Sequence, residues 1–141
     1  MGKLTKSSIG LRVFGDEVIP EQITSLLGHE PTGSGIKGHP RYPSISPNKP
    51  RLARTGSWVL SCKDRSPGDL DGQVKEILDL LTNDFKIWKK LSEQYELDMF
   101  CGLWLTTYNE GISLSLETLK ALSDRHIFID FDIYHDDGEE E

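Results

Sequence analysis

Apolar and polar residues alternate in two stretches of the chain, residues 7–15 and residues 127–135. A period of two residues is typical of a half-buried β-strand. In the first stretch Ile9, Leu11 and Val13 fall on one face of the expected strand. In the second stretch the apolar residues, which we expect to point inward, are Ile127, Ile129, Phe131 and Ile133. The residues that we then expect to point outward are Asp130, Asp132 and Tyr134.

Two further stretches are also predicted to be strands. Residues 56–63 (GSWVLSCK) place Trp58 and Leu60 on one face. Residues 97–108 (LDMFCGLWLTTY) are apolar on both faces at their centre, which is typical of a strand in the interior of a sheet. After the turn NEG, the sequence ISL at residues 112–114 offers one more short strand.

A helical period of apolar residues runs through residues 70–95 and predicts one long helix of about seven turns. The apolar face of this helix is formed by Leu70, Val74, Ile77, Leu78, Leu81, Phe85, Trp88, Leu91 and Tyr95. A shorter helix is expected at residues 20–28, with Pro20 in its first position and Gly28 at its end. A third helix is expected at residues 115–123, with Ser115 as its N-cap.

The order of these elements is β-α-loop-β-α-β-(β)-α-β. It predicts an α+β fold: a four- to five-stranded mixed or antiparallel sheet with three helices packed mainly on one face. We expect an N-terminal arm at residues 1–7 and a single domain at residues 8–135. That domain would contain a long basic loop, rich in proline and glycine, at residues 29–55. We expect residues 136–141 to form an acidic, disordered tail.

Composition supports a globular protein, with 36% hydrophobic and 28% charged residues among 141. No apolar run approaches the roughly 20 residues that span a bilayer, and the first residues lack the apolar core of a secretory signal. We therefore expect a cytoplasmic protein without a membrane partner. The formal net charge is -7, and the last six residues carry five of the acids. Such a tail either solvates the end of the chain or attracts a basic partner.

Residues 33–58 reverse this charge, because they contain several cations and no Asp or Glu. The cations are Lys37, Arg41, Lys49, Arg51 and Arg54. They are candidates for binding anions or nucleic-acid phosphates, with Tyr42 available for stacking. The alternative is that they pair with acids of the protein's own sheet. The loop also begins with GSGIKG, but a helix precedes it and prolines follow it, so it is not a phosphate-binding glycine loop.

The acids Asp130 and Asp132 are the other candidate site, because residues two apart on a strand project side by side at about 6–7 Å. We expect them to contact a protein partner together with Tyr134, Asp136 and Asp137. The alternative is a structural role in which they pair with Arg12 or Arg54.

No metal motif, nucleophile motif or cofactor fingerprint accompanies these residues, so we expect no catalytic residue, no metal site and no cofactor. His29 and His39 flank the start of the basic loop. A role for them as general bases is one catalytic hypothesis, and a role for Asp130 and Asp132 as acid and base is another.

The sequence resembles a bacterial family known as domain of unknown function 4279. The resemblance covers roughly residues 8–135. It is carried by the opening segment that ends in LLGHEPT, by TGSW at residues 55–58, by GISLSLETLKAL and by the closing DFDIY. It implies a small cytoplasmic α+β domain, and it brings no catalytic residues with it.

By analogy of size and charge, we expect a non-enzymatic binding module, most concretely an immunity-like protein that covers a basic, nuclease-type toxin. One alternative is a small protein that binds nucleic acid or a phosphoanion through the basic loop at residues 37–54. A structural or regulatory domain is the third possibility, and in that case the loop would only pin its own sheet.

Overall fold

The structure, a computed structural model, describes residues 2–43 and 51–135. In chain order its first elements are β1 (Gly2–Lys3), β2 (Lys6–Gly15), α1 (Pro20–Leu27), β3 (Gly33–Gly35) and β4 (Gly56–Ser61). These are followed by α2 (Leu70–Asp79), α3 (Phe85–Gln94) and β5 (Glu96–Leu105). The last elements are β6 (Glu110–Gly111), α4 (Leu116–Asp124) and β7 (Phe128–His135).

Five of the strands form one mixed sheet in the order β3-β4-β2-β5-β7. The β5–β7 pair is parallel and the other three pairs are antiparallel. The predicted α+β class is therefore confirmed, and β5 lies in the sheet interior as expected from its apolar centre. The short strands β1 and β6 pair with each other in parallel, apart from this sheet.

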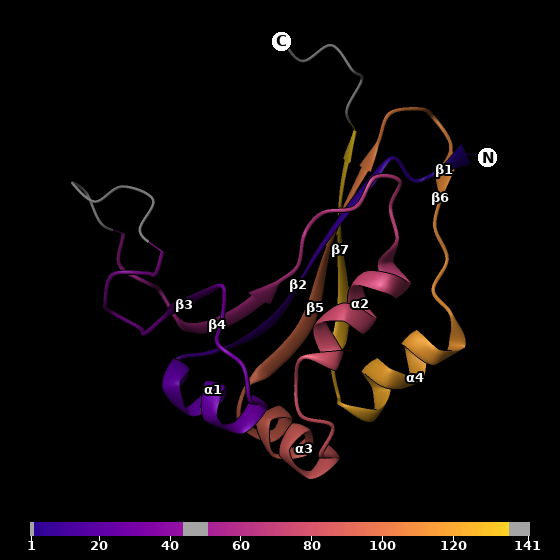
Figure 1. Cartoon of the computed structure of the whole chain (residues 1–141). Helices are drawn as coiled ribbons and strands as arrows, with labels where there is room; N and C mark the ends of the chain where they lie inside the picture. Colours follow the sequence, from indigo (N-terminus) through magenta and orange to yellow (C-terminus); the bar gives the residue numbers. More distant parts are fainter. Residues whose placement is uncertain (1, 44–50, 136–141) are drawn as a thin grey trace.

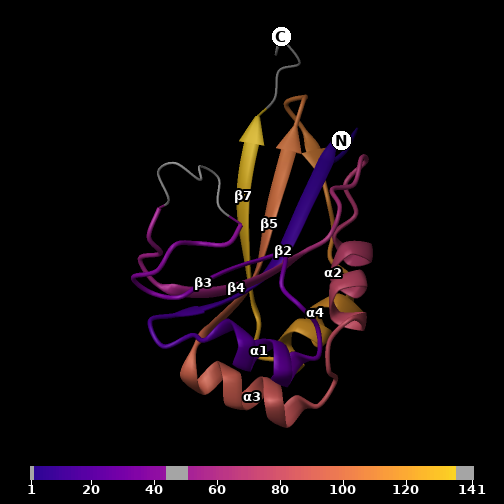
Figure 2. The same ribbon diagram turned by 60° about the vertical axis from the view of Figure 1, so that its left-hand side comes forward.

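The helices cover one face of the five-stranded sheet (Figures 1 and 2). The covered face contributes the core residues Leu11, Val13, Trp58 and Met99, all of which are fully buried. On the helix side Trp88 of α3 is fully buried as well. The opposite face of the sheet carries no helix, and we call it the open face. Within residues 2–43 and 51–135, no helix is long and apolar enough to cross a bilayer.

The long helix predicted for residues 70–95 is wrong, because the structure divides it into α2 and α3 and so has four helices in the described residues. The chain leaves the helical path after Asp79, and the Leu81 amide bonds to the Leu78 carbonyl. The Asp84 carboxylate then accepts a hydrogen bond from the Lys86 amide and starts α3. This break lets α3 pack against β5 while α2 packs against β2.

The short strand expected at residues 112–114 is also wrong. The segment that pairs is Glu110–Gly111, and its partner is β1. The Glu110 carboxylate anchors this region. It accepts hydrogen bonds from the backbone amides of Thr5 (2.8 Å), Thr106 (2.9 Å) and Thr107 (2.9 Å). The first residues of the chain are thereby attached to the turn that follows β5.

In β7, the prediction that every apolar residue points into the core fails for the second half of the strand. Ile129 packs against the core, but Phe131 is 46% exposed and Ile133 is 61% exposed. The upper halves of β5 and β7 extend beyond the helices (Figure 1), so the helix-facing side of β7 is uncovered there. Alternation predicts which way a side chain points, and it does not predict whether anything covers it.

Candidate functional site

The open face carries a row of charged and aromatic side chains at its centre. The strand register places Arg12 of β2 beside Asp98 of β5, and Asp98 beside Phe128 of β7. The Arg12 guanidinium donates two hydrogen bonds to the Asp98 carboxylate, at 2.7 and 2.5 Å. It also lies over the rings of Phe14 and Phe100, at 5.3 and 4.3 Å from their centroids. Arg12 is therefore held firmly in place by its neighbours.

Asp98 links this pair to Asp130 on the neighbouring strand. The hydrogen bond from Arg12 to Asp98 raises the pKa of the Arg12 guanidinium. A hydrogen bond with Asp98, together with desolvation and the Asp98 charge, raises the pKa of Asp130 above its ordinary value. Arg12 opposes this rise, because its positive charge favours the ionised form of Asp130. The three side chains therefore form one electrostatic unit.

Beside this unit, residues 41 and 51–55 of the basic loop and the β4 side of the open face line a cavity of about 840 Å³. The sheet contributes Arg12, Phe14, Ser57 and Val59 to its lining, and the loop contributes Arg41, Arg51, Leu52, Ala53, Arg54 and Thr55. We call this cavity the arginine hollow. It brings together arginines that are up to 42 positions apart in the sequence, Arg12 and Arg54.

Backbone hydrogen bonds hold the two ends of the loop together and so position these arginines. The Arg41 amide donates to the Arg51 carbonyl at 3.2 Å. The Ala53 amide donates to the His39 carbonyl at 2.8 Å. Tyr42 exchanges two backbone hydrogen bonds with Ser34 of β3, at 2.7 and 2.8 Å. Arg41 and Arg51 therefore lie on two neighbouring segments that are hydrogen-bonded to each other. Tyr42 attaches these segments to the sheet edge through β3.

The cations of the loop fall into two groups. Lys37 forms an ion pair with Asp16 at 2.9 Å and does not line the hollow. Arg41, Arg51 and Arg54 line the hollow, and none of them forms an ion pair with a carboxylate in residues 2–43 and 51–135.

Of the remaining residues predicted for this site, Tyr42 is 69% exposed and lines a different cavity, between the loop and α1. His39 lines that same cavity. Lys49 lies outside the described residues.

On the β7 side of the open face lies a smaller cavity of about 420 Å³, lined by Phe14, Ser92, Tyr95, Glu96, Leu97, Asp98, His126, Phe128 and Asp130. His126 has a positive φ of 58°. Its amide bonds to Ser123, and the following amide of Ile127 bonds to Leu122. This is the usual left-handed end of a helix, so the backbone of His126 terminates α4 and is no sign of catalytic strain.

The acids expected to meet a protein partner lie at different depths on β7. Asp130 is exposed, whereas Asp132 is half-buried and accepts a hydrogen bond from the Tyr134 hydroxyl at 2.5 Å. The Tyr134 ring stacks on Trp104 of β5, with ring centroids 4.9 Å apart. Lys6 of β2 lies over the Trp104 ring, with its ammonium group 4.3 Å from the ring centroid. Asp136 and Asp137 lie outside the described residues.

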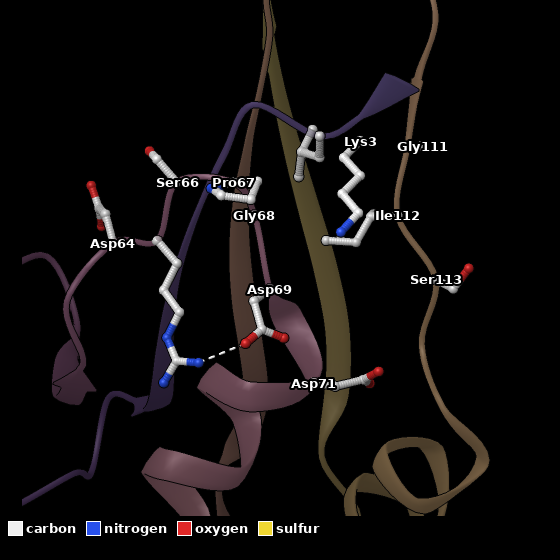
Figure 3. A pocket seen from close by; sticks show the side chains of 12 residues that line it. Lys3, Asp64, Ser66, Pro67, Gly68, Asp69, Asp71, Gly111, Ile112 and Ser113 are labelled. Atoms are coloured by element: carbon white, nitrogen blue, oxygen red, sulfur yellow. Dashed lines mark hydrogen bonds and ion pairs between the residues drawn. The ribbon is translucent and has the colours of Figure 1, made fainter. Parts of the chain in front are cut away.

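A further cavity, of about 960 Å³, lies between the 64–69 turn and the β6–α4 segment (Figure 3). Arg65 forms ion pairs with Asp69 at 2.6 Å and with Glu76 at 2.7 Å. Asp69 caps α2 through the Gly72 amide, and Asp71 accepts from Ser115 and Thr118 at the start of α4. Arg65, Asp69 and Asp71 of this cavity are thus engaged in holding helices, whereas the arginines of the loop are not paired with any carboxylate of the described residues, so we take the open face as the candidate functional site.

Sequence reasoning found the loop arginines, but it did not place Arg12 and Phe14 next to them. The sequence suggests Arg12 as an internal partner for the β7 acids, whereas the structure bonds it to Asp98. The signal available was its position in β2, because an outward arginine between apolar inward residues must lie on the face that the helices leave open.

Taken together, fold and site define an α+β protein with one helix-covered and one open sheet face, the open face bearing the arginine hollow. Residues 5–136 match the family described as Domain of unknown function (DUF4279), and the chain belongs to that family. No curated protein and no solved structure gives a significant match to the chain.

Proposed function

We propose that this protein is a non-enzymatic, cytoplasmic binding module whose arginine hollow takes a compact phosphate-bearing anion. The observation that carries this proposal is the convergence of Arg41, Arg51 and Arg54 on one cavity of the open face. Guanidinium groups remain protonated at any physiological pH, so they bind and orient anions but do not transfer protons. That chemistry supports binding over acid–base catalysis.

Phosphate suits the hollow because the planar guanidinium fork matches two oxygens of one phosphate group. Arg12 is already bonded to Asp98, so the ligand would be met mainly by the three loop arginines. Phe14 and Leu52 line the hollow as well, and they supply apolar surface for the rest of a small ligand. The volume of the arginine hollow, about 840 Å³, falls in the usual range of small-molecule sites.

The surrounding charges favour a small anion over a long nucleic acid. Asp98 and Asp130 lie on the adjoining strands of the same face, so a phosphate backbone that crossed the sheet would meet them. The whole chain is also acidic, with a formal charge of -7. Charges beyond about 8 Å are largely screened at physiological salt, so the acids far from the hollow affect a small ligand little, and Asp98 is already neutralised by Arg12.

The test is a calorimetric and NMR titration with three probes: pyrophosphate, citrate and a single-stranded RNA oligonucleotide. We expect saturable pyrophosphate binding, with amide shifts at residues 51–54 and weaker binding of citrate. Arg51→Ala with Arg54→Ala should weaken pyrophosphate binding at least about tenfold, because each charge-assisted hydrogen bond contributes roughly 1.5–3 kcal/mol. Both arginines are exposed, so the double variant should fold normally.

Lys37→Ala is the matched control, because it removes a positive charge from the same loop at a residue that is paired with Asp16 and lies outside the hollow. It should change the dissociation constant less than about twofold. Equal weakening by Lys37→Ala and by the arginine variant would mean that general charge, not the hollow, attracts the probe. RNA affinity that rises with oligonucleotide length and falls steeply with salt would overturn the proposal in favour of a nucleic-acid function.

A second candidate function is favoured by the acids of β7. Asp130 is exposed on the open face, and five further acids follow the strand in the sequence. Complementary charge speeds the capture of a basic partner, and this supports an immunity-like protein that binds a nuclease-type toxin. Its test is co-expression: the chain should rescue cells from a basic nuclease toxin, and the charge reversal Asp130→Lys with Asp132→Lys should abolish the rescue.

A further inference from the structure

The outer edge of β7 has no strand beside it in the part of the chain that the structure describes. β7 is the last strand of the sheet order and pairs only with β5. It runs for 8 residues from Phe128 to His135, which is longer than most edge strands that proteins leave open. Unpaired backbone groups along such an edge are a template for another strand.

The side chains of β7 are exposed on both faces of the sheet. On the helix side Phe131 is 46% exposed and Ile133 is 61% exposed. On the open face Phe128 is 76% exposed and Asp130 is exposed as well. The edge therefore presents Phe131 and Ile133 on the helix side, and on the open face it presents Asp130 and Asp132 between Phe128 and Tyr134. A strand laid against it would meet a different chemistry at each alternate residue.

A second copy of this chain fits the edge poorly. In a symmetric antiparallel pair, directly opposed residues lie on the same face of the joined sheet. A pair centred on residue 131 would oppose Asp130 to Asp132, and a pair centred on residue 132 would oppose Asp132 to its own copy. Like charges directly opposite each other are destabilising, so the acids act against self-pairing at these registers.

We propose that β7 receives an extended, basic segment of another protein by strand addition. Lys or Arg at every second position of that segment would lie opposite Asp130 and Asp132 on the open face. The intervening apolar residues would cover Phe131 and Ile133 on the helix side. Main-chain hydrogen bonds to the β7 edge would supply the affinity, and the alternating side chains would supply the specificity. This site is separate from the arginine hollow, and it does not require the partner to be a toxin.

The experiment uses the full chain and two synthetic peptides of about ten residues, one alternating valine with lysine and the other alternating valine with glutamate. We expect the lysine peptide to bind, and binding should slow hydrogen exchange of β7 backbone amides. Asp130→Lys with Asp132→Lys should weaken the lysine peptide at least about tenfold and create binding of the glutamate peptide, because attraction becomes repulsion at two cross-strand pairs.

Two further variants keep the result interpretable. Asp132→Lys alone leaves the Arg12–Asp98–Asp130 unit intact, so it provides a folded variant if the double reversal is unstable. It should show the same change of preference to a smaller degree. Glu93→Gln with Glu117→Gln neutralises two exposed acids on α3 and α4 and should leave peptide binding unchanged.

Three outcomes overturn the proposal. One is equal binding of both peptides, and another is peptide binding that leaves the β7 amides unprotected. The third is a concentration-dependent dimer of the unmodified chain in which β7 is protected, because the edge would then belong to a second copy.

Discussion

Single residues on the open face divide into those whose charge is neutralised within the protein and those whose charge is not. Arg12 belongs to the first group, because Asp98 neutralises it and two aromatic rings flank it. Arg51 and Arg54 belong to the second group, because no carboxylate in the described residues pairs with them. This division, more than the number of cations, determines where an anion can bind.

The first prediction concerns the electrostatic coupling between Asp98 and Asp130. Asp98 is 3% exposed. The substitution Asp98→Asn removes the negative charge of this side chain and leaves Arg12 without its ionised partner. We expect a loss of about 2–3 kcal/mol in the free energy of unfolding, since Arg12 remains partly hydrated. The pKa of Asp130 should fall in the variant, because the Asp98 carboxylate raised it by hydrogen bonding to protonated Asp130 and by its charge, and Arg12 remains.

Urea denaturation measures the stability change, and a carbon-13 NMR titration of the carboxyl groups measures the pKa of Asp130. In the unmodified chain the raised pKa means that ionised Asp130 disfavours the fold. Its contribution to stability is therefore fully present below the ordinary carboxyl pKa and is lost as pH rises through the folded value. An Asp130 titration that is identical in both proteins would contradict the coupling.

The second prediction concerns Glu110, which holds the N-terminal residues to the turn after β5. Desolvation alone would raise its pKa, but hydrogen bonds from Thr5, Thr106 and Thr107 outweigh it and lower the pKa to about 2. A carboxylate with a depressed pKa stabilises the fold above its unfolded pKa, and the stabilisation is lost as pH falls through the folded value. We expect this loss between about pH 4.5 and about pH 2.

Unfolding measured by urea across that pH range should show a steeper decline for the unmodified chain than for Glu110→Gln. The variant should be less stable at neutral pH, because the amide replaces an ionised acceptor of several hydrogen bonds. Glu93→Gln serves as the control, since Glu93 is exposed on α3 and accepts no hydrogen bond in the described residues. Parallel pH profiles for the unmodified chain and Glu110→Gln would rule this role out.

At the scale of elements, alternation and helical period were sufficient for the α+β class and for the interior position of β5. They were insufficient wherever an apolar pattern continues through a break. Leu78, Leu81 and Phe85 keep the helical spacing although α2 ends at Asp79 and α3 begins at Phe85. The capping sequence TND at residues 82–84 was the available signal, but it is weaker than an uninterrupted apolar stripe.

The site was less predictable than the fold because it depends on pairings between distant segments. The amide of Arg41 bonds to the carbonyl of Arg51, and GSG at residues 33–35 becomes the edge strand β3 beside β4. Three residues containing two glycines carry no alternation of apolar side chains, so no periodicity reveals that strand. The sequence thus predicted a basic loop, but it did not predict that the loop folds back onto the sheet.

The third prediction tests the boundary between α2 and α3. Asp84→Ala should lower the free energy of unfolding by about 1 kcal/mol, because it removes the side-chain cap and the favourable charge at the start of α3. Asn83→Ala, one residue earlier and also exposed, should have little effect. Both are measured by urea denaturation, and equal losses in the two variants would show that Asp84 does not define the start of the helix.

At the scale of the whole molecule, charge is distributed unevenly over one sheet face. The arginine hollow lies on the β4 side and the acids lie on the β7 side, with the Arg12–Asp98 pair between them. The net charge of the whole chain, -7, conceals this arrangement, because the positive charges of the hollow and the negative charges of β7 cancel in the sum. The same acids leave β7 open to a basic strand while they disfavour pairing with a second copy.

The fourth prediction follows from that dual role. Asp130→Asn with Asp132→Asn keeps the shape of β7 but removes the like charges that would oppose each other in a symmetric pair. Phe131 and Ile133 remain exposed, so we expect the variant to self-associate more strongly than the unmodified chain. Sedimentation velocity over a range of concentrations measures this. The variant Glu93→Gln with Glu117→Gln also loses two negative charges, but on α3 and α4, so it should sediment like the unmodified chain. If it associates as strongly as the β7 variant, the loss of net charge is the cause and the edge of β7 is not.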